Sequence, residues 1–205
     1  MGLYSDVLFP MCFDFFMELS PYIEKYRKEL LKNVKGNILE IGFGTGLNLP
    51  HYPDHVRALN TVDPNPGLTK KALKKIERSL IKVNHYTISG ENLPMEDNTF
   101  DSITCSWTLC SIPDVDQALK EISRVLKPDG RFYFIEHGLS CDPKVQKWQQ
   151  RLNPIQKIIA VGCHINRNMR EIIGKQLTIL ELKKFYIEKG PKTHGYMFQG
   201  IAEKL

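Results

Sequence analysis

The stretch Asn37-Ile-Leu-Glu-Ile-Gly-Phe-Gly-Thr-Gly-Leu-Asn48 carries the strongest structural signal in this chain of 205 residues. An apolar strand runs into three alternating glycines, Gly42, Gly44 and Gly46, and Asp63 closes the next apolar strand. In an open α/β sheet, this arrangement forms a nucleoside-binding crevice at the carboxyl ends of the strands. The glycines let the backbone approach a ligand closely, and the acid can accept hydrogen bonds from a ribose.

The glycine spacing argues against two common classes of nucleotide site. A dinucleotide fingerprint requires its third glycine at position 47, where this chain has Leu47. A phosphate loop requires Gly-Lys-Ser or Gly-Lys-Thr, and neither follows the glycines. The pattern is instead Glu-x-Gly-x-Gly-x-Gly, with Glu40 two residues before the first glycine. The sequence therefore favours a nucleoside ligand without phosphates.

Hydrophobic periodicity predicts alternating strands and helices along the chain. Helices are expected at residues 21–35, 68–80, 114–126, 143–161 and 167–176, and strands at 38–41, 58–62, 83–88, 100–106, 131–136, 178–188 and 196–203. Asp114 and Gln117 are typical of a capping box, and Lys127-Pro-Asp-Gly130 is typical of a turn. This order predicts an α/β fold: a Rossmann-like, seven-stranded, mostly parallel sheet with helices on both faces.

The length fits a single domain, with an N-terminal lid or helical segment at residues 1–35 and the main body at residues 36–205. The net charge is +5, and residues 141–205 hold twelve Lys or Arg against five Asp or Glu. A solvated helix surface accounts for this excess, and we expect no nucleic-acid partner. The apolar residues 7–19 are too short to span a bilayer, but they suit a hydrophobic lid containing Phe9, Phe13, Phe15 and Phe16, or a peripheral membrane contact.

The five cysteines are odd in number and lack paired metal-ligand spacing, so the sequence predicts no metal site. No secretory signal is recognisable, and a reduced cytoplasmic location, with membrane association through residues 7–19 as a variant, is expected. Cys110 and Cys163 are interpreted as small buried residues. The oligomeric state is left open.

The glycine pattern and Asp63 resemble motif I of the class I S-adenosylmethionine-dependent methyltransferases. The segments 89–101 and 118–130 resemble the ubiquinone/menaquinone-biosynthesis type of these enzymes, although Ser89 stands where that type often has Asp. A closer resemblance is to the thiol S-methyltransferases of the methyltransferase-like group. It rests on Asp63-Pro-Asn-Pro66, Gly90-Glu-Asn92, Thr108-Leu-Cys-Ser111, Glu136-His137, Trp148-Gln-Gln150, Gly162-Cys163 and the tail around His194.

The resemblance implies S-adenosylmethionine as cofactor and assigns roles to residues at the strand ends. The glycines would face its methionine part, Glu40 its amino group, Asp63 its ribose, Gly90 and Glu91 its adenine, and Ser106 and Trp107 the methionyl end. The full cofactor-binding set is Glu40, Gly42, Gly44, Gly46, Asp63, Pro64, Gly90, Glu91, Ser106 and Trp107.

The expected reaction is methylation of a small-molecule acceptor, with a thiol or another lipophilic acceptor as the first choice. His137 is the candidate base because an imidazole suits a thiol that is already partly ionised. Structural capping of the strand end is an equal alternative for His137, and packing roles are favoured for His164 and His194. Methylation of a quinone carbon or a phospholipid amine is the alternative reaction, and a non-catalytic cofactor-binding or RNA-associated protein is a third possibility.

Overall fold

A computed structural model describes residues 21–205 of the chain. The helices are α2 (Pro21–Leu31), α3 (Pro66–Ile76), α4 (Val115–Val125), α5 (Pro143–Ile159) and α6 (Met169–Gly174), with a 3₁₀ turn, η2, at Leu49–His51. The strands are β1 (Ile38–Ile41), β2 (Ala58–Val62), β3 (Lys82–Tyr86), β4 (Phe100–Ser106), β5 (Leu126–His137), β6 (Leu177–Tyr186) and β7 (Tyr196–Lys204). The expected lid or membrane contact at residues 7–19 lies outside the described residues. Within residues 21–205, none of the helices has the length and apolar character needed to cross a membrane.

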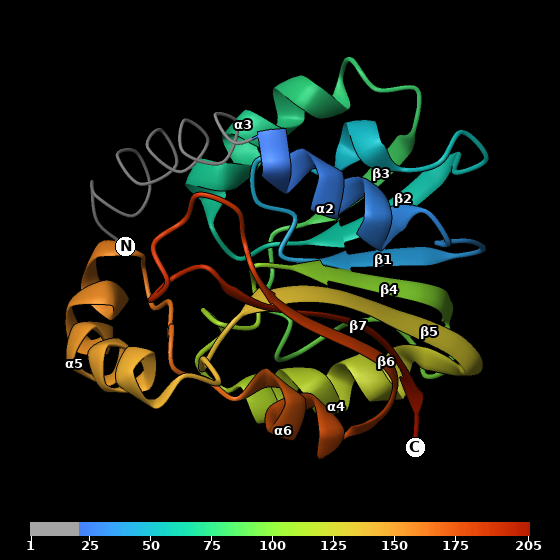
Figure 1. Ribbon diagram of the computed structural model, residues 1–205. Coiled ribbons are helices and arrows are strands. Elements are labelled where there is room, and N and C mark those ends of the chain that lie inside the picture. The colour runs from blue at the N-terminus through green and yellow to red at the C-terminus, as the bar shows by residue number, and fades with distance from the viewer. Residues whose placement is uncertain (1–20) are drawn as a thin grey trace.

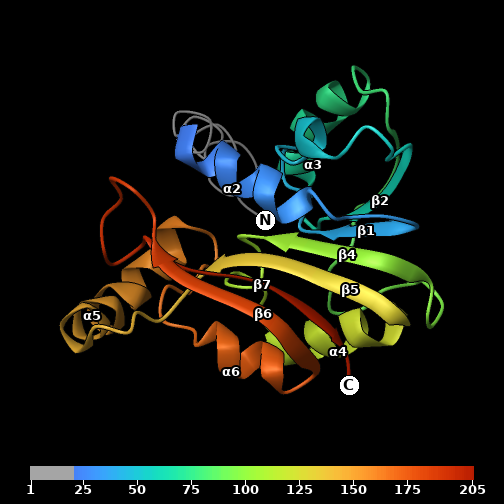
Figure 2. The same cartoon turned by 45° about the vertical axis from the view of Figure 1, so that its right-hand side comes forward.

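The strands form one seven-stranded sheet in the order β3-β2-β1-β4-β5-β7-β6. The pairs from β3 through β5 are parallel, whereas β7 lies antiparallel between β5 and β6. Helices α2 and α3 cover one face, and α4 and α6 cover the other (Figures 1 and 2). This architecture confirms the predicted Rossmann-like, mostly parallel sheet with helices on both faces.

Two hydrophobic clusters fill the space between the sheet and its helices, one on each face. Strand β5 supplies both, because successive side chains in a strand point to opposite faces. Phe132 and Phe134 are buried with the α4 and α6 residues, whereas Tyr133 and Ile135 are buried with Leu30 and Leu31 of α2. The fully buried central strands explain why the sequence shows continuous apolar runs there.

The predicted turn at residues 127–130 is present, although it falls within the bounds of β5: an added Cβ on Gly130 would lie 3.0 Å from the Lys127 carbonyl oxygen, which extended backbone does not allow. Phe100 pairs with Leu126, but Ser102 pairs with Arg131, so the register shifts between the two pairs. Between these two pairs the chain advances by two residues in β4 and by five residues in β5. The extra residues of β5 therefore form a bulge. The Pro-Asp-Gly residues therefore turn the chain within a bulge of β5.

The predicted capping box is half formed. The Asp114 carboxylate accepts the backbone N–H of Gln117 at 2.9 Å, as expected. The return contact is missing, because the Gln117 amide donates to the Glu91 carbonyl and the N–H of Asp114 donates to the Glu91 carboxylate at 2.7 Å. Glu91 therefore completes the start of α4 from another segment of the chain.

Candidate functional site

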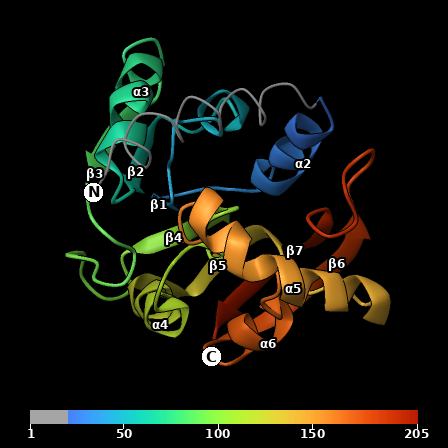
Figure 3. The ribbon, with the colours of Figure 1, turned by 90° about the vertical axis from the view of Figure 1, so that its left-hand side faces the viewer.

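A cavity of about 220 Å³ opens where β1, β2 and β4 end. Figure 3 faces the side of the molecule where α5 lies in front of the strands. The cavity is lined by Arg27, Glu40, Ile41, Gly42, Phe43, Gly44, Thr45, Leu47, Val62, Asp63, Pro64, Asn65, Leu68, Ser89, Gly90, Ser106, Trp107, Thr108, Ser111, Ile112, Pro113, Ala160 and Val161. Its position matches the crevice expected outside the carboxyl ends of parallel strands.

The glycine loop is held open by steric exclusion and by Asp63. Gly42 has a φ of +74°, and a Cβ there would lie 2.0 Å from Oγ1 of Thr108, so only glycine fits. A Cβ on Gly44 would meet nothing within 4 Å, because this residue faces the cavity. The Asp63 carboxylate accepts the N–H of Gly44 at 2.8 Å and that of Asn65 at 2.9 Å. Asp63 thus fixes the loop and also lines the cavity.

Burial raises the pKa of Asp63, and the two backbone N–H donors oppose this shift. The side chain is 6% exposed, so a ligand hydroxyl that reaches it would meet a largely desolvated acceptor. Hydrogen bonds to such an acceptor are stronger than those in water. The burial and acceptor capacity of Asp63 are therefore compatible with the predicted contact to ribose hydroxyls.

Glu40 is buried in a network of neutral donors beside the glycine loop. Asn48 donates to one Glu40 oxygen and the Tyr52 hydroxyl to the other, both at 2.8 Å. The Asn48 amide also reaches the hydroxyl of Ser106 at 2.8 Å. Burial raises the pKa of Glu40 to about 7, because its neighbours compensate only part of the lost hydration. A cationic ligand group that approaches Glu40 would favour the ionised carboxylate.

Arg27 of α2 is a site residue that sequence reasoning missed. It lines the cavity, is 6% exposed, and donates to the side-chain oxygen of Asn48. Its guanidinium carbon lies 4.7 Å from the centre of the Trp107 ring, a cation–π arrangement. Burial lowers the pKa of Arg27 to about 10, partly opposed by Glu40, so the guanidinium remains charged at neutral pH. Arg27 and Glu40 place opposite charges at the same end of the cavity.

A second side of the cavity is apolar and comes from loops. Ile112 and Pro113 follow β4, and Ala160 and Val161 follow α5. We call these four residues the acceptor wall. Val161 has a φ of +45°, which is a strained conformation for a β-branched residue. Trp107, on the other side, has a φ of +52°. Strained backbone of this kind clusters at functional sites.

The structure gathers most of the predicted cofactor residues around this one cavity. Eight line it: Glu40, Gly42, Gly44, Asp63, Pro64, Gly90, Ser106 and Trp107. Gly46 lies behind the loop, where an added Cβ would be 3.3 Å from the Phe43 ring. Glu91 accepts from the hydroxyl of Ser89 at 2.7 Å and from the start of α4, as described above. The predicted adenine contact of Gly90 and Glu91 stays a prediction.

His137 is not among the cavity-lining residues. Its Nε2 lies 2.9 Å from the sulfur of Cys163, and its role as a base stays a prediction. His164 contacts Asn153 at 3.5 Å, and His194 contacts Gln156 at 3.1 Å, in keeping with the packing roles expected for them. Neither of these histidines lines the cavity.

The residues present fit S-adenosylmethionine, the cofactor expected from the resemblance. The glycine loop leaves room for close backbone approach, and Asp63 offers an acceptor for ribose hydroxyls. The zwitterionic end of the cofactor finds Arg27 for its carboxylate and Glu40 for its ammonium group. Among the described lining residues, Arg27 is the one Lys or Arg, which is too little basic charge for a polyphosphate.

Comparisons with known proteins agree with this geometry. Residues 39–134 match the protein family described as "Methyltransferase domain". Over 153 residues, the chain is 34% identical to thiol S-methyltransferase TMT1A of Homo sapiens, covering 69% of this chain and 62% of that protein. It is also 34% identical to thiol S-methyltransferase TMT1B of Rattus norvegicus, covering 75% of this chain and 67% of that protein. The chain thus spans about two thirds of the length of these relatives.

More distant similarities extend to other members of the fold. The chain is 35% identical over 114 residues to the ubiquinone/menaquinone biosynthesis C-methyltransferase UbiE of Rickettsia felis, covering 52% of this chain and 46% of that protein. The crystal structure of N-methyltransferase NodS from Bradyrhizobium japonicum, in complex with S-adenosyl-L-homocysteine, superposes with a TM-score of 0.69. It covers 92% of this chain and 90% of NodS at 16% identity, so this likeness concerns the fold.

Proposed function

We propose a thiol as the methyl acceptor of this chain, which belongs to the class I S-adenosylmethionine-dependent methyltransferases. Its cofactor is S-adenosylmethionine. The observation that carries the thiol assignment is the 34% identity to two proteins named thiol S-methyltransferases, which extends over 69% and 75% of the chain. Both alignments are longer than the 96 positions of the family match, since 134 − 39 + 1 = 96.

Methyl transfer to a thiol needs little from the protein beyond alignment of the reactants and exclusion of water. Bound S-adenosylmethionine supplies a methyl group activated by its sulfonium centre. A thiolate sulfur forms a bond to the methyl carbon while the bond from that carbon to the cofactor sulfur breaks, with its electron pair remaining on that sulfur. The thiol proton leaves to solvent, because a thiol with a pKa near ~8.5 is partly ionised at neutral pH. A dedicated enzyme base is therefore not required.

The two sides of the cavity suit this reaction. A thiolate and a sulfonium lose their charges as they react, so an apolar surface around the reacting atoms favours the transition state over the separated ions. The acceptor wall supplies that surface through Ile112, Pro113, Ala160 and Val161. Arg27 and Glu40 would hold the amino acid end of the cofactor, which aligns the methyl group with the wall.

The experiment is a methylation assay on the purified protein with S-adenosylmethionine and a panel of acceptors. The panel contains an alkyl thiol, a quinol and phosphatidylethanolamine vesicles, and mass spectrometry identifies the methylated product. We expect a methyl thioether and an equal amount of S-adenosylhomocysteine with the thiol. The matched alcohol of the same chain length should give no product, because an alcohol is not ionised at neutral pH.

The alternatives have distinct outcomes. Methylation of the quinol without thiol turnover would replace the proposal with C-methylation, which the similarity to UbiE favours over other acceptors. Transfer to phosphatidylethanolamine alone would indicate an N-methyltransferase. Tight cofactor binding without turnover on any acceptor would indicate a non-catalytic cofactor-binding protein, including one that associates with RNA.

A further inference from the structure

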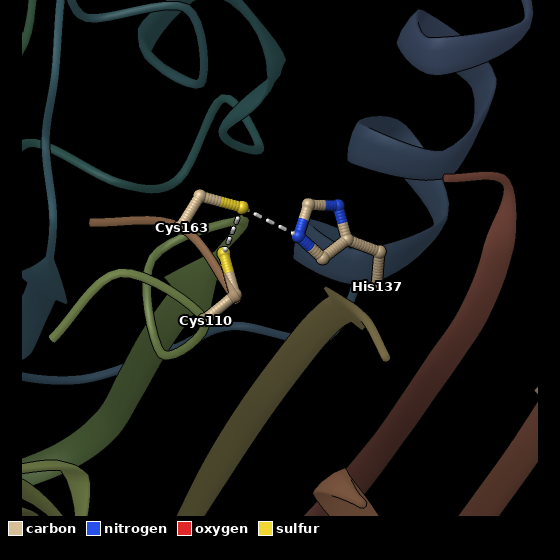
Figure 4. A group of neighbouring side chains, drawn as sticks. All are labelled: Cys110, His137 and Cys163. Atoms are coloured by element: carbon tan, nitrogen blue, oxygen red, sulfur yellow. Dashed lines mark hydrogen bonds between the residues drawn. The ribbon is translucent and has the colours of Figure 1, made fainter. Parts of the chain in front are cut away.

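Two thiols and an imidazole converge from three separate parts of the chain (Figure 4). Cys110 lies in the loop after β4, His137 ends β5, and Cys163 lies in the loop after α5. The Cys163 sulfur is 2.9 Å from Nε2 of His137 and 3.7 Å from the Cys110 sulfur. All three potential ligand atoms lie within 4.8 Å of one another. We call these residues the Cys-His-Cys cluster.

Two of the three distances between these atoms can be compared with those of a coordination tetrahedron, and the third, from the Cys110 sulfur to the His137 ring nitrogen, is within 4.8 Å. With zinc–sulfur bonds of about 2.3 Å and zinc–nitrogen bonds of about 2.0–2.1 Å, tetrahedral angles put two sulfurs about 3.8 Å apart and a sulfur and a nitrogen about 3.5 Å apart. The observed sulfur–sulfur distance of 3.7 Å already matches the first value. The His137–Cys163 distance of 2.9 Å would have to lengthen by about 0.6 Å to reach the second, a small rotation of the ring.

The backbone around the cluster holds these ligands in place without an ion. The N–H of His164 donates to the carbonyl of Cys110 at 2.8 Å, which joins the two cysteine-bearing loops. Arg167 donates to the carbonyl of Leu109 and ties the same loop down from the other side. Cys110 and Cys163 are 1% and 5% exposed, so both sulfurs are shielded from solvent. A site assembled in this way is preorganised, since binding would not require the loops to be ordered.

Polar groups outside the cluster support the sulfurs as ligands. The Gln156 amide donates to the Cys163 sulfur at 3.8 Å, and the hydroxyl of Ser111 lies 3.5 Å from the Cys110 sulfur. Gln156 is itself oriented by His194, whose Nε2 lies 3.1 Å from the amide oxygen. Outer hydrogen bonds of this kind orient the ligands of metal sites and stabilise thiolates.

We propose that Cys110, His137 and Cys163 bind one Zn²⁺ ion, with a water molecule in the fourth position. Zinc is favoured over a monovalent ion because two thiolates carry two negative charges, which a divalent ion cancels at a buried site. Binding replaces the two thiol protons by the metal and releases them to the buffer. The imidazole binds through Nε2, the nitrogen that faces the Cys163 sulfur. His137 is then a ligand rather than a free base.

The site would link the parts of the molecule that form the acceptor wall. Ser111, Ile112 and Pro113 directly follow Cys110, and Ala160 and Val161 come just before Cys163. An ion that joins the two cysteines therefore fixes both loops to the end of β5. This proposal is independent of the identity of the methyl acceptor, since no cluster residue lines the cavity.

The test is metal binding by the full chain, purified under reducing conditions and stripped of metal with a chelator. We expect one equivalent of Zn²⁺ to bind, to raise the melting temperature and to release protons measured by calorimetry in buffers of different ionisation enthalpy. Cys163→Ser and Cys110→Ser should each weaken zinc binding by at least roughly 100-fold, because a charged ligand is lost. Cys141→Ser is the matched control, because Cys141 is exposed and outside the cluster.

A second measurement on the unmodified protein covers the case in which these variants fail to fold. Co²⁺ should give thiolate-to-metal charge-transfer bands, and X-ray absorption of the zinc form should show two sulfur neighbours and an imidazole. Absence of zinc binding, or binding without sulfur neighbours, would overturn the proposal. Formation of a Cys110–Cys163 disulfide on mild oxidation, by a reduced protein that binds no zinc, would identify the cluster as a redox pair instead.

Discussion

The two sides of the cavity are built on different principles. The cofactor side comes from the ends of β1 and β2, where Gly42, Gly44 and Asp63 lie within 22 positions of the sequence, since 63 − 42 + 1 = 22. Backbone hydrogen bonds and one excluded Cβ set its shape. The acceptor wall joins Ile112 to Val161, which are far apart in the sequence, through apolar side chains. The first side recognises one ligand by local geometry, whereas the second depends on how distant loops pack and can therefore vary with the acceptor.

The largest expected effect is a loss of stability when Gly42, on the cofactor side, is replaced. Gly42→Ala combines a positive φ with a contact of 2.0 Å to Thr108, and we expect a loss of about 3–5 kcal/mol in unfolding free energy. Gly44→Ala is the matched control, because its Cβ meets no protein atom within 4 Å and only the strain of about 1 kcal/mol remains. Urea denaturation measures both. Equal losses for the two variants would show that steric exclusion by Thr108 does not shape the loop.

Glu40 tests whether the buried polar network of the cofactor side carries a charge. Its pKa in the folded protein is raised to about 7 from 4.5, so the folded state binds the proton more tightly than the unfolded state does. This contribution to stability is fully present below pH 4.5 and is lost as the pH rises through about 7, a change of about 3 kcal/mol. Glu40→Gln cannot ionise, so its stability relative to the native sequence should rise by most of that amount between pH 5 and pH 8 in urea titrations. Parallel pH profiles for the two proteins would contradict this assignment.

Substitutions of Asp63 test cofactor binding on the same side of the cavity. Asp63→Ala removes a buried charged acceptor, and we expect cofactor affinity to fall by roughly 1–3 kcal/mol in calorimetry. Asp63→Asn keeps one acceptor oxygen and should lie between this variant and the native protein. Thiol KM, measured at saturating cofactor, should change little. An unchanged cofactor affinity in Asp63→Ala would remove the ribose assignment.

The smallest expected effect on stability comes from a substitution in the acceptor wall. Val161→Gly relieves the positive φ of 45° and removes a side chain from the wall. We expect the unfolding free energy to stay within about 1 kcal/mol of the native value, because relief of strain offsets the lost packing. The KM for an apolar thiol should rise severalfold, while calorimetry shows unchanged cofactor affinity. A loss of cofactor affinity instead would mean that the two sides are not separate.

The same contrast explains which features could be predicted from the sequence. The order of strands and helices and the cofactor side of the cavity follow from local patterns, in which glycine spacing and apolar runs have direct structural meaning. Arg27 was not predicted because it is one of several charged residues on α2. Its position over the Trp107 ring depends on the packing of that helix in the folded protein. The residues of the acceptor wall could not be predicted one by one, because the motifs beside them, Trp148-Gln-Gln150 and Gly162-Cys163, indicate a family but not which side chains reach the cavity.

The Cys-His-Cys cluster shows the limit of reading ligand sites from spacing. Its members are separated by 27 and 26 positions, since 137 − 110 = 27 and 163 − 137 = 26. Their meeting depends on how the loops after β4 and α5 return to the end of β5. Glu91 has a role that its segment did not predict, because its carboxylate accepts the N–H of Asp114 at the start of α4.

The position of β7 has a consequence for synthesis on the ribosome. Strand β7 lies between β5 and β6 and is the hydrogen-bonding partner of both, yet it follows both in the sequence. Strands β1 to β5 can pair with one another as soon as they emerge, whereas β6 must wait for residues 196–204. The nascent chain therefore exposes an unpaired β5 edge and a free β6 until residues 196–204 have been made, which is a period when it is open to aggregation and to chaperones.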